Sequence, residues 1–308
     1  MERVVIVIAG PTCSGKTDVS ISLAQKINGE IISADSRQVY KHLTIGTAKP
    51  SKEQLGKVKH HFIDELMPDV EFNASKFEVE TIELIRKIFE KGKTPIVVGG
   101  SGLYIRALVD GIMNSVETEL DYRKQLYEQR EKFGNEFIYE QLKKVDPKSA
   151  DEMLPQNWKR VIRALEVFHL TGEPIWKHQN EFERDLDFEF VQFGLRWERE
   201  TLYKNIDSRV DKMIEHGLVN EVEGILGRGF TKELYSLNTV GYKEIISYLN
   251  NEISLERAVE LIKRNTRRYA KKQMTWFRRD ERINWLNMNE SSRPESVAEE
   301  IARQISVV

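Results

Sequence analysis

Near its N-terminus the chain reads VVIVIAGPTCSGKT, from Val4 to Thr17. The run Val4–Ala9 is continuous, apolar and rich in β-branched residues, which is typical of a buried parallel strand. The eight residues that follow fit the pattern G-x-x-x-x-G-K-[ST] without a gap, and a helical pattern continues to about Ile27. Because a P-loop requires this order of strand, glycine loop and helix, the stretch predicts a phosphate-binding loop next to a strand of an α/β sheet.

The glycines of this loop allow several backbone N–H groups to point inward at phosphate oxygens, and the helix N-terminus adds partial positive charge. We expect Lys16 to contact the terminal phosphate and the hydroxyl of Thr17 to bind Mg²⁺. Cys13 occupies a variable position of the pattern, and we interpret it as a small filler side chain. The residues assigned to the phosphate site are Gly10, Pro11, Thr12, Cys13, Ser14, Gly15, Lys16 and Thr17.

Strand and helix patterns alternate along much of the chain. The runs predicted to be strands are Val4–Ala9, Glu30–Ser33, Pro95–Val98, Phe188–Leu195 and Ile283–Leu286. Helical patterns cover Lys16–Ile27, Ala74–Glu90, Leu255–Phe277 and Glu295–Ile305. This alternation predicts an α/β fold, with a P-loop NTPase-like parallel sheet core flanked by helices.

A different pattern occupies the middle of the chain. From Glu117 to Asn180 the sequence is helical and charged and contains no strand candidate. We therefore expect an all-helical insertion domain, residues 115–186, within a core domain made of residues 1–114 and 187–308.

The composition is that of an ordinary globular protein, with 308 residues, 40% hydrophobic and 31% charged. No run approaches the roughly 18 apolar residues of a membrane span, and the first apolar run is too short for a signal-peptide core. The single cysteine excludes an internal disulfide and a cysteine-rich zinc site. We expect a cytoplasmic monomer with no membrane partner.

Charge is distributed unevenly. The net charge is −2, yet the segment from Lys263 to Arg282 holds nine basic and two acidic residues. On a helical projection the basic residues lie opposite the apolar face that contains Ile262, Tyr269 and Phe277. This basic face consists of Lys263, Arg264, Arg267, Arg268, Lys271 and Lys272. It is either the solvated face of an amphipathic helix or, as its nearly uniform sign favours, a surface for RNA phosphates.

The positions of acidic residues near strand ends indicate which class of P-loop protein this is. Motor-type NTPases hold Mg²⁺ with an acid at the end of a second buried strand, but the strand Pro95–Val98 is followed by Gly99, Gly100 and Ser101. The carboxylate nearest a strand end is Asp35, which favours a kinase or a group transferase. From the residues alone, Asp35 is equally a general base and a helix N-cap.

Three segments together resemble one family, the bacterial tRNA dimethylallyltransferases. They are the P-loop, the stretch Ser33–Tyr40 (SADSRQVY) and the stretch Gly99–Tyr104 (GGSGLY), in the same order and spacing. Further similar segments are His60–Asp64, Gln156–Arg160, Gly241–Glu244 and Arg267–Gln273. The resemblance therefore covers most of the chain, and the motifs in combination are far more specific than a P-loop alone.

The resemblance implies a donor, dimethylallyl diphosphate, and an acceptor, the exocyclic amine of adenine at position 37 of the tRNA anticodon loop. Asp35 is then the general base on that amine, and Arg209 helps to hold the diphosphate. The implied catalytic residues are Asp35, Lys16, Ser101 and Arg209. The family usually has threonine at position 101, so this chain keeps the hydroxyl and lacks the methyl group.

The resemblance also implies contacts with the tRNA anticodon stem-loop. Residues 36–38 line the flipped adenine, position 101 and Arg123 touch RNA near it, and residues 156–160 and the basic helix contact the stem-loop. The full set is Asp35, Ser36, Arg37, Gln38, Ser101, Arg123, Gln156, Asn157, Trp158, Lys159, Arg160, Lys263, Arg264, Arg267, Arg268, Lys271 and Lys272.

A base inside an ordered loop must be turned out into a pocket before it can react. Gln38 is suited to read its edge, and Tyr40, Tyr104 or Trp158 could stack on it, although each aromatic is individually more typical of a core. Two rival functions remain open from the residues alone. One is an ATP-dependent kinase, and the other is an RNA-binding protein whose P-loop only senses nucleotide.

Overall fold

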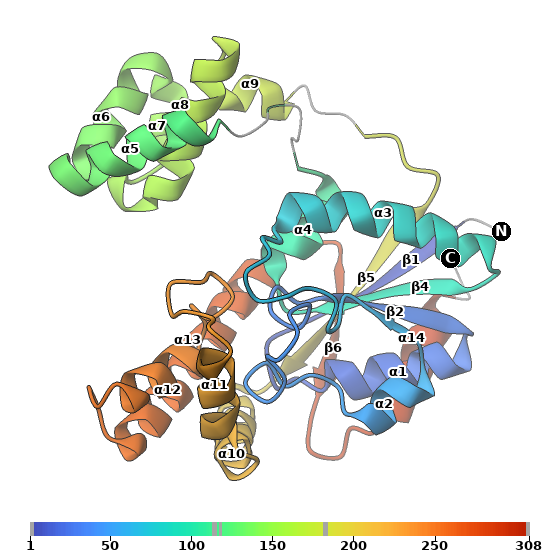
Figure 1. Ribbon diagram of the computed structural model, residues 1–308. Coiled ribbons are helices and arrows are strands. Elements are labelled where there is room, and N and C mark those ends of the chain that lie inside the picture. The colour runs from blue at the N-terminus through green and yellow to red at the C-terminus, as the bar shows by residue number, and fades with distance from the viewer. Residues whose placement is uncertain (1–2, 113–115, 117–118, 181–183, 306–308) are drawn as a thin grey trace. The chain divides into compact units, whose positions relative to one another are not determined.

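The computed structural model describes residues 3–112, 116, 119–180 and 184–305. Its centre is a parallel sheet in the order β3-β2-β4-β1-β5-β6 (Figure 1). The strands are β1 (Val4–Ala9), β2 (Gly29–Ala34), β3 (His60–His61), β4 (Thr94–Gly99), β5 (Glu189–Trp197) and β6 (Ile283–Met288). The P-loop strand β1 lies between β4 and β5, with Ile6 opposite Ile96 on one side and Val191 on the other. The predicted parallel α/β core is thus confirmed.

Helices α1 (Lys16–Lys26) and α14 (Pro294–Ile305) cover one face of this sheet, and α3 (Ala74–Glu90) and α4 (Gly102–Asp110) cover the other. The short helix α2 (Lys52–Lys57) packs on α1. A further group of helices packs together: α10 (Arg199–Glu215), α11 (Leu218–Gly227), α12 (Tyr242–Leu249) and α13 (Leu255–Phe277). The bounds of α3 and α13 are those predicted. Within the described residues, no helix has the length and apolarity that crossing a membrane needs.

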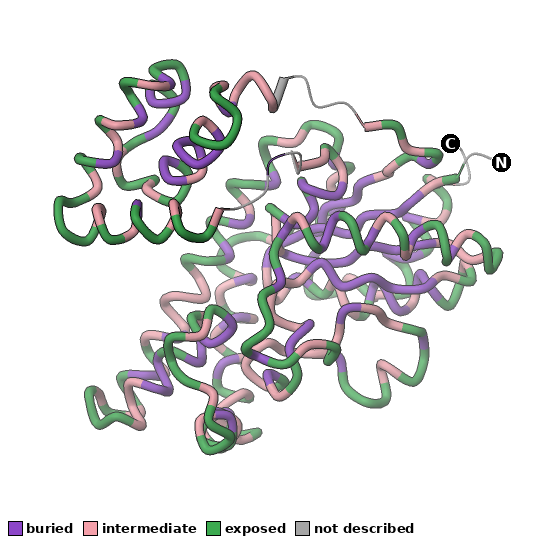
Figure 2. The backbone as a smooth tube through the Cα atoms, turned by 45° about the horizontal axis from the view of Figure 1, so that its top comes forward, coloured by how far each residue is buried: buried purple, intermediate pink, exposed green. Residues whose placement is uncertain are grey.

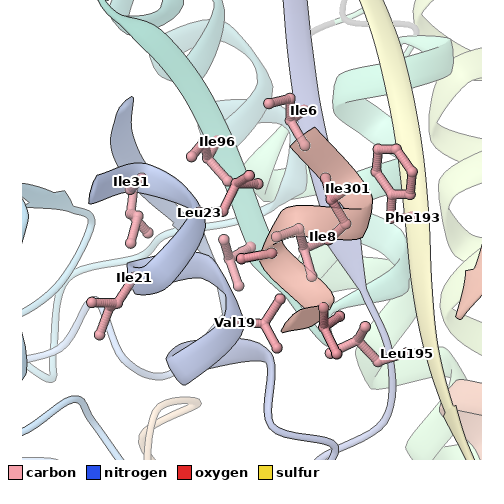
Figure 3. Packing of buried hydrophobic residues seen from close by; sticks show 14 of the residues in the cluster. Ile6, Ile8, Val19, Ile21, Leu23, Ile31, Ile96, Phe193, Leu195 and Ile301 are labelled. Atoms are coloured by element: carbon pink, nitrogen blue, oxygen red, sulfur yellow. The ribbon is translucent and has the colours of Figure 1, made fainter. Parts of the chain in front are cut away.

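Alternation along β1 explains the packing of the two faces. Successive side chains of a strand point to opposite faces, so Ile6 and Ile8 face the layer of α1 and α14. Figure 3 shows Val19 and Leu23 of α1 and Ile301 of α14 gathered against these isoleucines. On the other face α3 packs on β4 and α4 packs on β1. The sheet is therefore buried on both sides, which holds the carboxyl ends of β1, β2 and β4 in fixed positions.

The chain divides into two compact units, one of residues 1–110 with 186–308 and one of residues 111–185. The second unit is all-helical over its described residues. Its helices are α5 (Leu120–Phe133), α6 (Asn135–Val145), α7 (Pro147–Asp151), α8 (Trp158–Thr171) and α9 (Ile175–Asn180), with a 3₁₀ turn at Pro155–Asn157. Each unit has its own buried residues (Figure 2). From the sequence we expected the two boundaries at 114/115 and 186/187.

Candidate active site

The P-loop joins the end of β1 to the start of α1. Gly15 has φ of 86° and Cys13 has φ of 64°, so the loop turns through left-handed conformations that aim successive backbone N–H groups to one side. A side chain at Gly10 would lie 3.0 Å from the carbonyl oxygen of Leu195 on the neighbouring strand. The glycines therefore serve both the turn and the close approach to β5.

The ammonium group of Lys16 is folded back onto this loop. Its Nζ donates to the carbonyl oxygen of Pro11 at 2.7 Å and lies 3.5 Å from Oγ of Ser14. Removal from water and, to a smaller extent, the charge of Arg209 lower the pKa of Lys16 to about 8. A phosphate that binds beside this loop would therefore stabilise the charged form of Lys16.

Two adjoining cavities lie at this end of the sheet. We call the first, of about 140 Å³, the phosphate cavity, because the P-loop from Thr12 to Thr17 lines it. The second, of about 380 Å³, we call the adjoining cavity; Ser36, Arg37 and Tyr235 contribute to its walls. The two cavities share the residues Thr12, Asp35, Thr47, Ala48, Arg209 and Tyr269.

Asp35 follows the last residue of β2 and lines both cavities. Its Oδ1 accepts hydrogen bonds from the backbone N–H groups of Arg37 at 2.8 Å and Gln38 at 3.2 Å. One carboxylate oxygen therefore closes a turn, but no helix begins at this point, so the helix N-cap interpretation is wrong. A carboxylate has two oxygens, so this structural role is compatible with a chemical one.

Ser101 lies beside this turn. Its Oγ accepts a hydrogen bond from the backbone N–H of Ser36 at 3.0 Å, which leaves the hydroxyl proton available for another acceptor. Glycines permit the close approach, since a Cβ at Gly99 would lie 2.0 Å from the carbonyl oxygen of Ala34. The segment after β4 is thereby brought against the segment after β2.

Gln273 is a site residue that the sequence reasoning missed. Its side chain is buried on α13, where its Oε1 accepts from the N–H of Thr12 at 2.9 Å and its Nε2 donates to the carbonyl oxygen of Gly100 at 2.8 Å. It therefore ties the P-loop to the segment after β4. The available signal was a lone amide on the apolar face of an amphipathic helix, because a buried amide needs partners.

Arg209 of α10 lies at the junction of the two cavities. Its Nη1 is 3.4 Å from Oγ1 of Thr12 in the P-loop. Arg209 and Lys16 therefore line the same cavity, as the resemblance implied. They are far apart in the sequence, so no local pattern predicts that they meet.

The residues expected to read and stack on a base are arranged differently from the prediction. The amide of Gln38 is engaged internally: its Oε1 accepts from Ser33 at 3.1 Å and its Nε2 donates to the carbonyl oxygens of Thr47 and Ala48 at 3.2 and 3.3 Å. It therefore holds a neighbouring loop in this structure.

Two of the three candidate stacking aromatics lie in the core. Tyr40 and Tyr104 are 1% and 6% exposed, and the ring of Tyr104 on α4 stacks on Phe77 of α3. The aromatic rings that line the adjoining cavity are those of Tyr235 and Tyr269, 59% and 43% exposed. The guanidinium of Arg37 lies 4.1 Å from the ring centre of Tyr235.

The basic face of α13 is divided, which corrects the prediction of one continuous face. Lys263 forms an ion pair with Asp211 at 2.6 Å, and Arg267 forms one with Asp207 at 2.6 Å; both acids belong to α10. A helical projection of α13 does not include α10, so it could not show that Lys263 and Arg267 pair with acids of that helix. Arg264 is half-buried, and the basic residues that remain exposed are Arg268, Lys271 and Lys272.

The other predicted RNA contacts lie in the second unit. Arg123 donates to Glu166 at 2.7 Å, and Arg163 donates to the same carboxylate at 2.6 Å, so Arg123 takes part in the buried ion cluster of this unit. Trp158 lies under the guanidinium of Arg130 at 4.1 Å and packs against the helical core. Four residues of the predicted segment are exposed together: Gln156, Asn157, Lys159 and Arg160. Their contact with RNA stays a prediction.

The fold is that of an α/β protein with a glycine loop after its first strand and two adjoining cavities at that end of the sheet. The chain belongs to the IPP transferase family, whose model matches residues 38–280. The tRNA dimethylallyltransferase of Pelotomaculum thermopropionicum is 47% identical over 97% of this chain and 95% of its own length. That of Acetivibrio thermocellus is 46% identical over 95% of this chain and 94% of its own.

Solved structures give the same result. The tRNA isopentenylpyrophosphate transferase of Bacillus halodurans superposes with a TM-score of 0.74 at 38% identity, covering 100% of this chain and 96% of that one. A eukaryotic dimethylallyltransferase acting on tRNA superposes with a TM-score of 0.86 at 33% identity, covering 99% of this chain and 79% of that one.

Proposed function

We propose that this chain is a tRNA dimethylallyltransferase. It transfers the dimethylallyl group from dimethylallyl diphosphate to the exocyclic amine of adenine at tRNA position 37 and releases diphosphate, acting as a monomer in the cytoplasm. One observation carries the proposal: the carboxylate of Asp35 lies where a P-loop cavity meets an adjoining cavity with exposed aromatic walls. A phosphate-activated donor and a planar acceptor can meet at that junction. The family membership and the named relatives support this assignment.

The donor's diphosphate occupies the P-loop in this proposal. An allylic diphosphate ionises when the charge of the departing diphosphate is stabilised, and Lys16 and Arg209 supply cations at the loop. The P-loop also suits Mg²⁺, because the hydroxyl of Thr17 lines this cavity and is a hard oxygen ligand. Thr17, donor oxygens and water would hold the ion, which would neutralise part of the diphosphate charge.

The acceptor adenine occupies the adjoining cavity. Its exocyclic amine is a poor nucleophile, because the lone pair is delocalised into the ring, so a base that takes the proton as the new C–N bond forms accelerates transfer. Asp35 performs this role, and the hydroxyl of Ser101 lies near it as a donor. Tyr235 and Tyr269 offer the planar surfaces that a base turned out of its loop needs.

The RNA backbone contacts the exposed part of the basic helix and the four exposed residues of the helical insertion, Gln156, Asn157, Lys159 and Arg160. Arg268, Lys271 and Lys272 are exposed, and with Trp276 they line a shallow cationic surface. Phosphate contacts of this kind position the RNA without reading its sequence.

Salt dependence tests this surface. Changing Arg268 and Lys272 together to glutamine should flatten the slope of log affinity against log salt by roughly 1–2 units, because each phosphate contact contributes about 0.7–0.9. The matched control is the double change of Lys87 and Lys91 to glutamine, two exposed lysines of α3 and its C-cap. Binding of an anticodon stem-loop is measured from low to high salt. A slope equal in both double variants and the wild type would remove the helix from the RNA surface.

The reaction itself is tested by mass analysis of tRNA nucleosides. Incubation of unmodified tRNA with dimethylallyl diphosphate and Mg²⁺ should convert one adenosine per tRNA to N6-isopentenyladenosine. A transcript with guanine in place of the position-37 adenine should remain unchanged, since it lacks the acceptor amine. Incubation with ATP in place of the donor separates the kinase alternative, which predicts a phosphorylated product. If the folded protein forms none of the modified nucleoside, the proposed function is wrong.

A further inference from the structure

A short loop forms part of the walls of both cavities and contacts the helices α11 and α12. It runs from Thr44 to Ala48, and its last two residues, Thr47 and Ala48, line both cavities. The loop is closed by its own hydrogen bonds, in which the N–H of Ala48 donates to the carbonyl oxygen of Ile45 at 3.0 Å. The position of this loop therefore sets part of the wall on which donor and acceptor meet.

One carboxylate from outside the loop holds it. Oε2 of Glu221 accepts hydrogen bonds from the N–H groups of Thr44 at 3.0 Å and Ile45 at 2.7 Å, and Oε1 accepts from the N–H of Gly46 at 3.0 Å. Three consecutive N–H groups turned to one side form an anion-binding concavity. Here the anion is a side chain of the protein itself, delivered by α11.

Tyr242 completes this arrangement. Its hydroxyl donates to Oε1 of Glu221 at 2.6 Å, and burial together with that carboxylate raises the pKa of Tyr242, so the hydroxyl stays protonated. The ring lies against Gly46, where a Cβ would come within 2.4 Å of it. The carboxylate, the ring and the glycine thus fix the loop from the side of α11 and α12.

The loop is connected in turn to the proposed base. Nε2 of Gln38 donates to the carbonyl oxygens of Thr47 and Ala48, and the backbone N–H of Gln38 donates to Oδ1 of Asp35. A continuous set of hydrogen bonds therefore runs from Glu221 through the loop and Gln38 to Asp35.

We propose that Glu221 is a positioning residue for the transfer reaction: its carboxylate anchors the N–H groups of residues 44–46 and, through Gln38, orients Asp35 at the junction of the cavities. The proposal rests on the proposed function, because Asp35 is the base only if that function holds. Glu221 itself lines neither cavity, so it acts through the loop and not on the substrates.

A carboxylate is required here, and an amide of the same size does not replace it. The hydrogen-bond partners of this carboxylate among the described residues are all donors, three N–H groups and one hydroxyl. Glutamine would turn its own NH₂ group toward at least one backbone N–H, which would then have no acceptor. The variants Glu221→Gln and Glu221→Ala should consequently be impaired to a similar degree.

Chemical rescue gives the decisive test. Glu221→Ala leaves the N–H concavity and the Tyr242 hydroxyl in place, so added acetate or formate can enter as a replacement anion. The single-turnover rate at saturating donor and tRNA should fall by up to about 10²-fold, the scale of a 1 Å misplacement of reacting groups, with affinities changed much less. Acetate should restore much of the rate in Glu221→Ala and none in Glu221→Gln, whose side chain still fills the site. Chloride at equal ionic strength should restore neither.

Two further variants complete the design. Glu223→Ala, at an exposed position of the same helix, should turn over like the wild type with or without acetate. Tyr242→Phe removes one of the four hydrogen bonds and keeps the ring on Gly46, so it should lose less rate and should remain folded if the alanine variant is unstable. A wild-type rate in Glu221→Ala, or a lost rate that acetate does not restore in a folded variant, would overturn the proposal. If Glu221→Ala does not fold, a wild-type rate in Tyr242→Phe would also overturn the proposal.

Amide hydrogen exchange separates this inference from the proposed function. In Glu221→Ala the N–H groups of residues 44–46 should lose protection and regain it in acetate, whatever reaction the protein catalyses. If the wild type modifies no tRNA, the proposed function fails while exchange still decides whether Glu221 anchors the loop. If the wild type modifies tRNA and exchange at residues 44–46 is unchanged in the variant, the positioning role alone is wrong.

Discussion

Lys16→Ala should abolish transfer of the dimethylallyl group and leave tRNA affinity within a few-fold of the wild type. The ammonium group already lies within the P-loop, where it donates to the carbonyl oxygen of Pro11 at 2.7 Å. A donor diphosphate offers it a far stronger acceptor, and the charge it neutralises grows as the allylic C–O bond breaks. Loss of this cation therefore raises the barrier for ionisation more than it weakens binding of the donor.

Single-turnover kinetics and equilibrium binding of an anticodon stem-loop measure the two quantities separately. A fall in rate of at least about 10³-fold with RNA affinity retained is the expected pattern, comparable with the loss of an electrostatic contact made mainly in the transition state. Lys87→Ala, at an exposed position on α3, is the control for charge removal. Near-normal turnover in Lys16→Ala would show that the loop does not hold the donor.

The same lysine predicts a pH dependence. Its pKa is lowered from 10.5 to about 8, so in the free protein it begins to lose its charge as the pH rises through about 8. Diphosphate affinity should decline across that range, and Lys16→Arg should remove the decline because arginine stays charged. The unfolded chain keeps its proton up to about pH 10.5, so between these values the unfolded state binds more protons. This group alone therefore makes the folded state more stable as the pH rises from about 8 to 10.5.

The sequence predicted five of the six strands and the glycine loop between β1 and α1 because their signals are local, and it missed the two-residue strand β3. A β-branched run needs no partner to be recognised, and the glycine pattern between Val4–Ala9 and Lys16 describes a backbone geometry directly. The helix Ala74–Glu90 was predicted with its observed bounds, since Asn73 caps its start and its apolar period is regular. Structural elements that depend on residues close in the sequence can therefore be predicted from the sequence.

The parts that were missed depend on neighbours in space. The sequence places Lys263 and Arg267 on one basic face of α13. In the structure they form ion pairs with Asp211 and Asp207 of α10. Gln273 looked like an exception on an apolar face, and only the fold shows that it joins Thr12 to Gly100.

The aromatic walls were missed for a related reason. Tyr40 and Tyr104 lie next to functional motifs in sequence, yet the core needs their volume. Tyr235 and Tyr269 lie 131 to 229 residues further along the chain and line the adjoining cavity instead.

Asp35→Asn should lower the single-turnover rate by about 10²-fold or more while the protein keeps its fold. Asparagine retains a side-chain oxygen, so it can still accept the hydrogen bonds that the N–H groups of Arg37 and Gln38 give to Oδ1. The turn after β2 is therefore preserved. What disappears is the ability to accept a proton from the adenine amine as its nitrogen bonds to the allylic carbon.

The control separates this effect from loss of negative charge in the cavity. Asp18 lines the phosphate cavity but not the adjoining cavity, and Asp18→Asn should stay within a few-fold of the wild-type rate. A structural role for Asp35 alone predicts that Asp35→Asn is nearly silent and that Asp35→Ala, which removes the turn acceptor, is damaging. A role as base predicts that both variants are slow and that asparagine restores stability without restoring rate. The rate of the asparagine variant under saturating donor and tRNA therefore decides between the two roles that the sequence alone left equal.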